Sequence, residues 1–560
     1  DVAAAVTAGV FSSALDHFIA FGQNESRTGS GVSDTVTSTP STTTTLEAGF
    51  DQVSGGSLND AIFGAITTAA TTTTLNAGDN IDGGAGTDTL NLTLSGGNYV
   101  GDATITNVEQ FAITASTAGR SFDADGLDGM TKLTNFRSGQ DLTVTNMESA
   151  ATTIGINKDS SANTTSVTFK NAALAGADDT VAIELSNVTA AEALTLASAG
   201  TNDIEKISIA SNGTVENFLG AISVADSGAA DTMTQVTATG SANLDIDAAA
   251  LDFAGNTTTS TATVDASAMT GRIKVDVDDG DANLRMTVTT GSGSDTVDFG
   301  DSLNANDTVD LGAGTDTILV DGLTDGSSTT LATAYSLSNV EVFQAAGVAE
   351  ASITISGAGQ TGLTTVRFVE NADTANDNGD TYTASNLAAG VAVQLNNTVN
   401  SRDMNTVTIS LADASGTSDE VTVITAGTAT HGADNNVDDI AITDVETLNI
   451  QSTFVGTTAL GAAEANTIDD ISADTTMTAI NVSGTEKTTI TLGSETTNLA
   501  TFNASDLSDD LTVDATALTA NVTFTGGSRE DTFTMGTTLN QNDTVDGGAD
   551  GTASGENDLL

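Results

Sequence analysis

The chain has no cysteine, no tryptophan and a single proline among its 560 residues. The lack of cysteine excludes disulfides, thiolate catalysis and cysteine-ligated zinc sites. No apolar run approaches the about 18 residues that a membrane-spanning helix needs, so we expect no membrane span. We also expect no cleavable signal peptide at the start of the sequence. With only three tyrosines, the core must be mainly aliphatic. Its valine, isoleucine and threonine residues favour strands over helices.

Basic residues are also scarce, with 14 Lys and Arg against 75 Asp and Glu, which gives a formal net charge of −61. A surface of this sign excludes nucleic acid and anionic membranes as partners. Such a chain repels itself when it becomes compact, so something must neutralise it on folding. Divalent cations are the simplest answer, and carboxylate-rich sites suit Ca²⁺. A merely solubilising acidic surface, as in halophilic proteins, is the competing explanation.

What the chain does have is a glycine- and aspartate-rich phrase that occurs three times, at 75–87, 303–315 and 539–551. The first copy reads Leu-Asn-Ala-Gly-Asp-Asn-Ile-Asp-Gly-Gly-Ala-Gly-Thr. A shorter phrase of the form Gly-Ser-x-x-Asp precedes each copy, at 56–60, 291–295 and 527–531, so that its starts lie 235 and 236 residues apart. Repetition at a fixed period indicates one structural unit built more than once.

Other short matches extend this repeat and divide the chain. Asn107-Val-Glu-Gln-Phe111 returns as Asn339-Val-Glu-Val-Phe343, and Val167-Thr-Phe169 as Val407-Thr-Ile409. We therefore predict five segments: an N-terminal helical segment at 1–27 with a helix over 12–22, a threonine-rich linker and first strand at 28–55, repeat units at 56–290 and 291–526, and the start of a third unit at 527–560. The first residue, Asp1, and the interrupted third unit indicate a processed chain or a piece of a longer one.

Within each unit, runs of four to seven residues alternate apolar and polar side chains, as half-buried strands do. Thr89-Leu-Asn-Leu-Thr-Leu94 and Arg272-Ile-Lys-Val-Asp-Val277 are examples. The runs follow one another at roughly 15–22 residues, separated by Gly, Asn and Asp. We predict an all-β fold of tandem, mainly parallel β-solenoid units in which each rung buries its apolar face against the next. Tandem antiparallel β-sandwiches are the alternative, because spacing alone does not fix strand direction.

The aspartates of the phrases are the candidate metal ligands. Glycine lets the backbone turn its carbonyls inward with positive φ, and the aspartate of one turn reaches an ion shared with the next. Asp and Gly are also what tight turns select, which is the structural alternative for each residue. The predicted calcium-site residues are Asp60, Asp79, Asp82, Gly84, Gly86 and Asp88 in the first cluster, Asp295, Asp301, Asp307, Asp310, Gly314 and Asp316 in the second, and Asp531, Asp543, Asp546 and Asp558 in the third.

These phrases, the threonine-rich strands and the absence of cysteine resemble RTX-type proteins exported by type I secretion. With the segment Asp16-His-Phe-Ile-Ala-Phe-Gly-Gln-Asn-Glu-Ser-Arg27, the chain is similar to calcium-dependent S-layer proteins of Gram-negative bacteria. The resemblance implies Ca²⁺-driven folding outside the cell, a two-dimensional homo-oligomeric lattice on the cell surface, and an N-terminal region that docks on lipopolysaccharide or another surface polysaccharide. The glycine-rich hexads are sparser here than in an uninterrupted β-roll.

Catalysis finds little support in the sequence. His17 and His431 lie near no nucleophile or metal-ligand pattern, and consecutive acids such as Asp178 and Asp179 point to opposite faces of a strand. We therefore predict a structural protein and not an enzyme. An RTX adhesin, or a subunit of an extracellular filament or sheath, is the alternative function, with the same repeats serving as a stalk.

Overall fold

The computed structural model describes residues 41–225, 232–253, 260–278, 284–323, 327–347, 352–369, 381–396, 403–427, 435–455, 465–473, 475–537, 539–549 and 558–560. The helix expected over 12–22, both histidines and the first part of the linker segment, 28–40, lie outside these residues. The chain forms two compact units, Asp1–Met233 and Thr234–Leu560. This division follows the contacts between residues in space. The predicted boundary between 290 and 291 follows the sequence repeat instead, and it stays a prediction.

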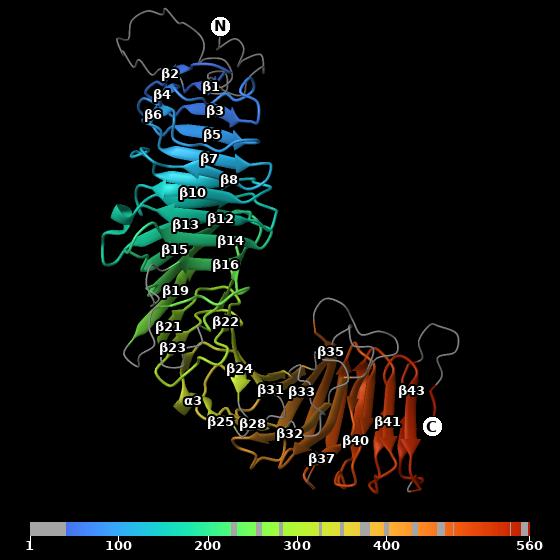
Figure 1. Cartoon of the computed structure of the whole chain (residues 1–560). Helices are drawn as coiled ribbons and strands as arrows, with labels where there is room; N and C mark the ends of the chain where they lie inside the picture. Colours follow the sequence, from blue (N-terminus) through green and yellow to red (C-terminus); the bar gives the residue numbers. More distant parts are fainter. Residues whose placement is uncertain are drawn as a thin grey trace, which may run out of the picture. The chain divides into compact units, whose positions relative to one another are not determined.

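In the first unit, successive strands alternate between two faces (Figure 1). One face is a single sheet whose strands stack in the order β1-β3-β5-β7-β9-β11-β13-β15. Its strands are β1 (Thr43–Thr45), β3 (Ala61–Ile66), β5 (Thr89–Leu94), β7 (Gln110–Ala115), β9 (Lys132–Phe136), β11 (Thr153–Asn157), β13 (Thr180–Ser186) and β15 (Lys206–Asn212). The other face consists of β2 (Gln52–Ser54), β4 (Asn80–Asp82), β6 (Thr104–Thr106), β8 (Arg120–Asp123), β10 (Leu142–Met147), β12 (Thr164–Phe169), β14 (Glu192–Ser198) and β16 (Asn217–Ala225), with the short helix η2 (Asn171–Leu174) between β12 and β13.

The second unit repeats this alternation. Its longest sheet contains β18 (Leu244–Ile246), β20 (Ile273–Asp276), β22 (Thr296–Asp298), β24 (Thr317–Leu323), β27 (Val342–Gly347), β29 (Thr365–Val369), β31 (Ala392–Asn396), β33 (Glu420–Gly427), β35 (Thr447–Phe454), β38 (Ala479–Gly484), β40 (Thr501–Leu507), β42 (Thr523–Thr525) and β44 (Thr544–Asp546). The opposite face begins with β17 (Gln235–Gly240), β19 (Thr261–Met269), β21 (Arg285–Thr289), β23 (Thr308–Asp310) and β26 (Ser336–Ser338).

The rest of that face is a second sheet, which begins at β25 just before the one-turn helix α3 (Leu331–Ala334). Its strands are β25 (Ser328–Thr330), β28 (Ser352–Ser356), β30 (Thr381–Leu387), β32 (Asp403–Leu411), β34 (Asn435–Ile442), β36 (Asn466–Ile468), β37 (Ile471–Ala473), β39 (Thr488–Thr491), β41 (Leu511–Ala515) and β43 (Asp531–Met535). Among the described residues of both units, every strand pair is parallel, as in β5 with β7 and β33 with β35. The predicted parallel β-solenoid is therefore confirmed, and the antiparallel sandwich is wrong.

Parallel stacking in register turns the alternating pattern into columns of buried side chains. In the first unit Leu90, Phe111, Leu133 and Ile154 pair in succession, each at most 1% exposed. Burial of such side chains contributes roughly 25 cal/mol per Å² of apolar surface. The core is thus aliphatic with a few phenylalanines, as the composition predicted. Among the described residues, no helix is long and apolar enough to cross a membrane.

Candidate cation sites at the turns

The first aspartate of the long phrase makes the same two hydrogen bonds in all three copies. One carboxylate oxygen accepts the N–H of the asparagine three residues earlier, and the other accepts an N–H from the preceding rung. The acceptors and donors are Asp79 with Asn76 (2.7 Å) and Asp51 (2.9 Å), Asp307 with Asn304 (2.6 Å) and Met286 (2.7 Å), and Asp543 with Asn540 (2.8 Å) and Val522 (3.0 Å). This residue therefore joins its own turn to the rung before it.

The second aspartate of the phrase holds the glycine turn that follows. Its Oδ1 accepts the N–H of the glycine two residues later in each copy: Asp82 from Gly84 (3.0 Å), Asp310 from Gly312 (3.2 Å) and Asp546 from Gly548 (3.1 Å). In the first two copies the next rung adds an asparagine with φ near +50°, whose Nδ2 donates to the same oxygen: Asn107 at 2.8 Å and Asn339 at 2.6 Å. Asparagine tolerates this left-handed backbone conformation.

The glycines of the two phrases stack directly on one another. Gly84 has φ +90°, and a Cβ there would lie 2.4 Å from the Gly56 carbonyl oxygen, which also accepts the Ala85 N–H at 2.9 Å. The later copies repeat this contact at Gly312 on Gly291 and at Gly548 on Gly527. A Cβ at Gly86 or Gly314 would likewise meet the preceding rung, 2.8 Å from the Leu58 carbonyl carbon and 1.9 Å from the Gly293 oxygen, respectively. The phrases recur together because each long phrase packs on the short one.

Six of the seven remaining predicted aspartates form short ladders of carboxylates, one ladder in each cluster and one carboxylate per rung. The N–H of Asp60 donates to Asp88 Oδ1 at 2.6 Å, and the N–H of Asp88 donates to Glu109 Oε2 at 2.8 Å. The second cluster repeats the arrangement, with Asp295 donating to Asp316 (2.7 Å) and Asp316 donating to Glu341 (2.9 Å). In the third, Asp531 donates to Asp558 at 3.1 Å.

Several of these carboxylates are buried with one oxygen unused. Asp88, Asp295 and Asp316 are fully buried, and the Oδ2 atom of each has no hydrogen-bond partner. Burial, together with repulsion from neighbouring acids, raises the pKa of Asp88, and it raises the pKa of Asp316 to about 6. Burial also raises the pKa of Asp531 to about 6. A buried carboxylate oxygen without a partner costs free energy of folding, and either a proton or a bound cation would offset that cost.

Asp60 differs because both of its oxygens are used. Gly56 N–H donates to Oδ2 at 2.7 Å, while the N–H and hydroxyl of Thr42 both donate to Oδ1. Burial opposes ionisation, but these bonds hold the pKa of Asp60 below its ordinary value.

The ladder also contains acids that the sequence prediction missed. Glu109 and Glu341 close the first two ladders, and the same contact occurs where no glycine phrase stands: Asp179 N–H donates to Glu205 (2.7 Å) and Asp419 N–H to Glu446 (2.8 Å). Each glutamate follows an Asn or Asp and a Val or Ile, as in Asn107-Val-Glu109 and Asp444-Val-Glu446. That recurring triplet, about one rung after an aspartate, was the available signal.

Asp301 joins none of these sets and lies exposed on a turn. Among the residues that the structure describes, no three His, Cys, Asp or Glu side chains converge as a metal cage would require. The predicted clusters are therefore ladders of single carboxylates on successive rungs. Their calcium binding stays a prediction, because the hydrogen bonds above already explain why the phrases contain Asp and Gly.

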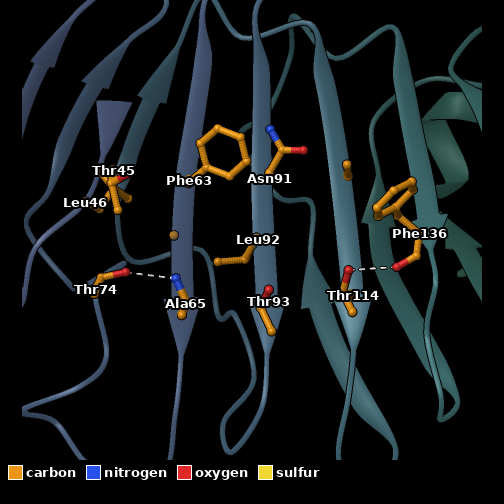
Figure 2. Close-up of a pocket in the computed structure, with 12 residues that line it drawn as sticks. Thr45, Leu46, Phe63, Ala65, Thr74, Asn91, Leu92, Thr93, Thr114 and Phe136 are labelled. Atoms are coloured by element: carbon orange, nitrogen blue, oxygen red, sulfur yellow. Dashed lines mark hydrogen bonds between the residues drawn. The ribbon is translucent and has the colours of Figure 1, made fainter. Parts of the chain in front are cut away.

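A separate feature of the first unit is a hollow of about 360 Å³ over β3, β5 and β7 (Figure 2). Its lining contains no charged side chain, in a chain that carries −61. Phe63, which is 42% exposed, and Phe136 lie at either side of a polar floor of Asn91, Thr93 and Thr114. Thr114 donates its hydroxyl proton to the Phe136 carbonyl at 2.7 Å, so that its lone pairs remain available.

No protein-family model matches the chain, and a comparison with curated proteins found no significant match.

Proposed function

We propose that the chain is a non-catalytic structural subunit of a calcium-dependent S-layer on a bacterial cell surface, of the RTX type that it resembles. The observation that carries this proposal is the carboxylate ladder, which contains fully buried oxygens of Asp88, Asp295 and Asp316 without a hydrogen-bond partner. A hard cation bound at each ladder would neutralise these oxygens and so stabilise the solenoid. It would gain that cation where calcium is abundant, outside the cell.

The residues fit calcium by type and by environment. Asp88 Oδ2 and Asp316 Oδ2 would supply carboxylate oxygens, and the stacked glycine turns bring backbone carbonyls close to them: a Cβ at Gly83 would lie 2.7 Å from Asp88 Oδ2 and 1.9 Å from the Asn107 carbonyl oxygen. Carboxylate and carbonyl oxygens are what Ca²⁺ prefers. When bound, the ion would supply positive charge that replaces a proton on these acids.

Charge also connects calcium to assembly. The described ion pairs are few, and most involve half-exposed lysines, such as Lys132 with Glu184 (2.8 Å) and Lys206 with Asp178 (2.6 Å). Two copies that each carry −61 repel one another unless cations bridge them. Head-to-tail contacts between repeated surfaces propagate into open arrays. Self-association should therefore depend on calcium more steeply than folding does.

The neutral hollow of the first unit is the surface that we assign to a cell-surface polysaccharide such as that of lipopolysaccharide. An aromatic ring beside hydroxyl and amide groups suits a sugar, which has an apolar face and a polar edge. Phe63 offers the ring, while Asn91 and Thr93 offer the polar groups. An uncharged lining avoids repelling anionic glycans, as the rest of this surface would.

An adhesin stalk or extracellular filament is the second candidate, favoured by the uniform parallel stacking of rungs in each unit. Light scattering and electron microscopy across a calcium titration separate the two. For the S-layer we expect a window of calcium concentration in which the protein is folded and monomeric, and ordered sheets above it. Filaments, or a monomer at high calcium and high protein concentration, would favour the second candidate. Circular dichroism that is identical in chelator and in millimolar Ca²⁺ would contradict calcium-dependent folding.

A further inference from the structure

The core of the first unit contains a cluster of polar side chains where the fold supplies aliphatic ones. In one column Leu92, Ile113, Asn135, Ile156 and Leu185 pair in succession, so that Asn135 interrupts a run of large aliphatic residues. On the opposite face Thr165 stands in the same way between its partners Leu142 and Leu194. The two interruptions meet across the core, where Asn135 Nδ2 donates to Thr165 Oγ1 at 2.7 Å.

A buried glutamate completes this contact. Glu192, at the start of β14, is fully buried, and its Oε1 accepts the Thr165 hydroxyl at 2.6 Å and lies 3.5 Å from Asn135 Nδ2. Its Oε2 accepts only the Asn163 N–H, at 3.3 Å. Burial raises the pKa of Glu192 to about 7, against the hydrogen bond from Thr165, and repulsion from Asp159 adds to the effect. The turn that contains Asp159 lies beside Glu192, because the Asn163 N–H donates to Glu192 and the Thr189 N–H, three residues before Glu192, donates to the Asp159 carbonyl oxygen at 2.9 Å.

Asp159 supplies a second carboxylate, and it is also fully buried. Its Oδ1 accepts the Ser161 N–H at 2.9 Å, whereas Oδ2 has no partner. Asn135 Oδ1 and Asn163 Nδ2 are likewise buried without a partner. Rotating the Asn163 side-chain amide by half a turn would place its oxygen where the unpaired Nδ2 now lies. The ion pairs of the described residues include neither Asp159 nor Glu192.

The fold itself does not require this cluster. In the second unit Phe343 corresponds to Phe111 of the first. Two residues further along each strand, Ile113 pairs with Asn135 and Ala345 pairs with Phe368, so Phe368 occupies the position equivalent to Asn135. Phe368 is fully buried and packs on Tyr382, with ring centroids 5.1 Å apart. An apolar side chain is therefore compatible with this position of the rung. Two buried carboxylates and several unpaired polar atoms cost free energy that an aliphatic core would not.

We propose that Asp159, Glu192 and Asn135 form a buried calcium site inside the first unit, separate from the turn ladders. Asp159 Oδ2 and Asn135 Oδ1 have no hydrogen-bond partner, and Glu192 Oε2 accepts a single long hydrogen bond, so the set offers two carboxylates and one amide carbonyl, hard oxygens that suit Ca²⁺. The ion neutralises the two carboxylates and satisfies the unpaired oxygens, and it links strand β9, the turn before β12 and strand β14. The site does not depend on the proposed surface array.

The test measures calcium that the full-length protein retains after passage over a chelating resin, by elemental analysis. Glu192→Gln and Asp159→Asn should each retain one calcium ion fewer per chain than the wild type. Glu184→Gln is the matched control, because Glu184 lies on neighbouring β13, half-exposed and paired with Lys132. It should retain the wild-type number. Equal calcium content in the wild type and in both folded site variants overturns the proposal.

A measurement on the wild type keeps the test decisive should both site variants fail to fold by circular dichroism. If a proton instead of a cation neutralises the cluster, infrared spectra of the calcium-loaded protein will contain the band of a buried protonated carboxylic acid that titrates near pH 7, distinct from the acids whose pKa is about 6, and this result overturns the proposal. The proposal expects that band to be absent with calcium and to appear when calcium is removed. Loss of array formation, by contrast, bears on the proposed function alone.

Discussion

The backbone N–H of Asp88 donates to the carboxylate of Glu109 at 2.8 Å, so two acids on successive rungs are held side by side without a basic residue between them. Asp316 and Glu341 repeat this contact at 2.9 Å. Each acid therefore stabilises the fold by accepting a hydrogen bond and destabilises it by repelling its neighbour. The balance between these effects can be measured by substitution.

Replacing Glu109 separates the two effects. Glu109→Gln keeps an acceptor and removes a charge, so in chelator it should be as stable as the wild type or more stable. Glu109→Ala leaves the Asp88 N–H without its partner and should lower the free energy of unfolding by about 1–3 kcal/mol. Urea denaturation with and without Ca²⁺ measures both. If the ladder binds calcium, the glutamine variant should also lose part of the stability that calcium adds.

The same pair of changes at Glu341 serves as the internal control, because it belongs to the second unit. Local action predicts that Glu341→Gln leaves calcium binding at the first ladder intact. Equal responses of glutamine and alanine variants at both positions would mean that the hydrogen bond contributes nothing.

Stability of the calcium-free protein should fall as the pH rises from about 4.5 to 7.5. Burial raises the pKa of Asp316 and Asp531 to about 6 and that of Glu192 to about 7. A carboxyl group whose pKa is higher in the folded state binds more protons there, so its contribution is complete below the unfolded pKa of about 4 and is lost as the pH passes the folded value. Thermal melts in chelator across this range measure the loss.

Calcium should flatten this pH dependence, because it takes the place of the proton on the same oxygens. Glu192→Gln should remove the part of the loss nearest pH 7 and leave the part near pH 6. A calcium-free protein that becomes more stable between pH 4.5 and 7.5 would show that hydrogen bonds, not burial, set these pKa values.

Much of the fold could be predicted from the sequence because its signals are local. Alternation within Thr89–Leu94 identifies a half-buried strand, and the two phrases mark the turns that stack. The spacing of the strands did not determine their direction. The parallel arrangement was favoured because short runs of this kind must bury their apolar sides against equivalent rungs. The composition of the phrases indicated calcium, yet the structure shows that backbone N–H groups use many of the same carboxylate oxygens.

The acids that sequence reasoning missed lie together only because of register. Glu109 follows Asp88 by one rung, and nothing local shows that its carboxylate reaches back to that N–H. Thr165 and Glu192 are 27 residues apart, and Asn135 is 30 residues before Thr165. Each of the three resembles an ordinary surface residue when read alone. Their burial depends on which strand each one pairs with.

The hollow of the first unit gives a prediction for glycan binding. Phe63→Ala removes the exposed ring and should weaken binding of purified cell-surface polysaccharide at least several-fold in a pull-down or calorimetric titration. The change should have little effect on stability, because Phe63 is 42% exposed. Leu58→Ala, at a residue of the same unit that is also 42% exposed but does not line the hollow, is the control. Equal binding by both variants would place the glycan elsewhere.

The stacked glycines allow the cost of a clash to be separated from the cost of backbone conformation. Gly84 and Gly126 have φ of +90° and +78°, so alanine at either position pays for a left-handed backbone, on the order of 1 kcal/mol. A Cβ at Gly84 would also lie 2.4 Å from the Gly56 oxygen, whereas at Gly126 nothing lies within 4 Å. Gly84→Ala should therefore destabilise the first unit by clearly more than Gly126→Ala, because the two phrases must move apart. Denaturation of the two variants in chelator measures the difference, which is the contribution of close packing between the phrases. If Gly84→Ala lowers the free energy of unfolding by no more than Gly126→Ala does, the glycines are needed only for the turn. Calcium binding would then be the better explanation for the repeated phrase.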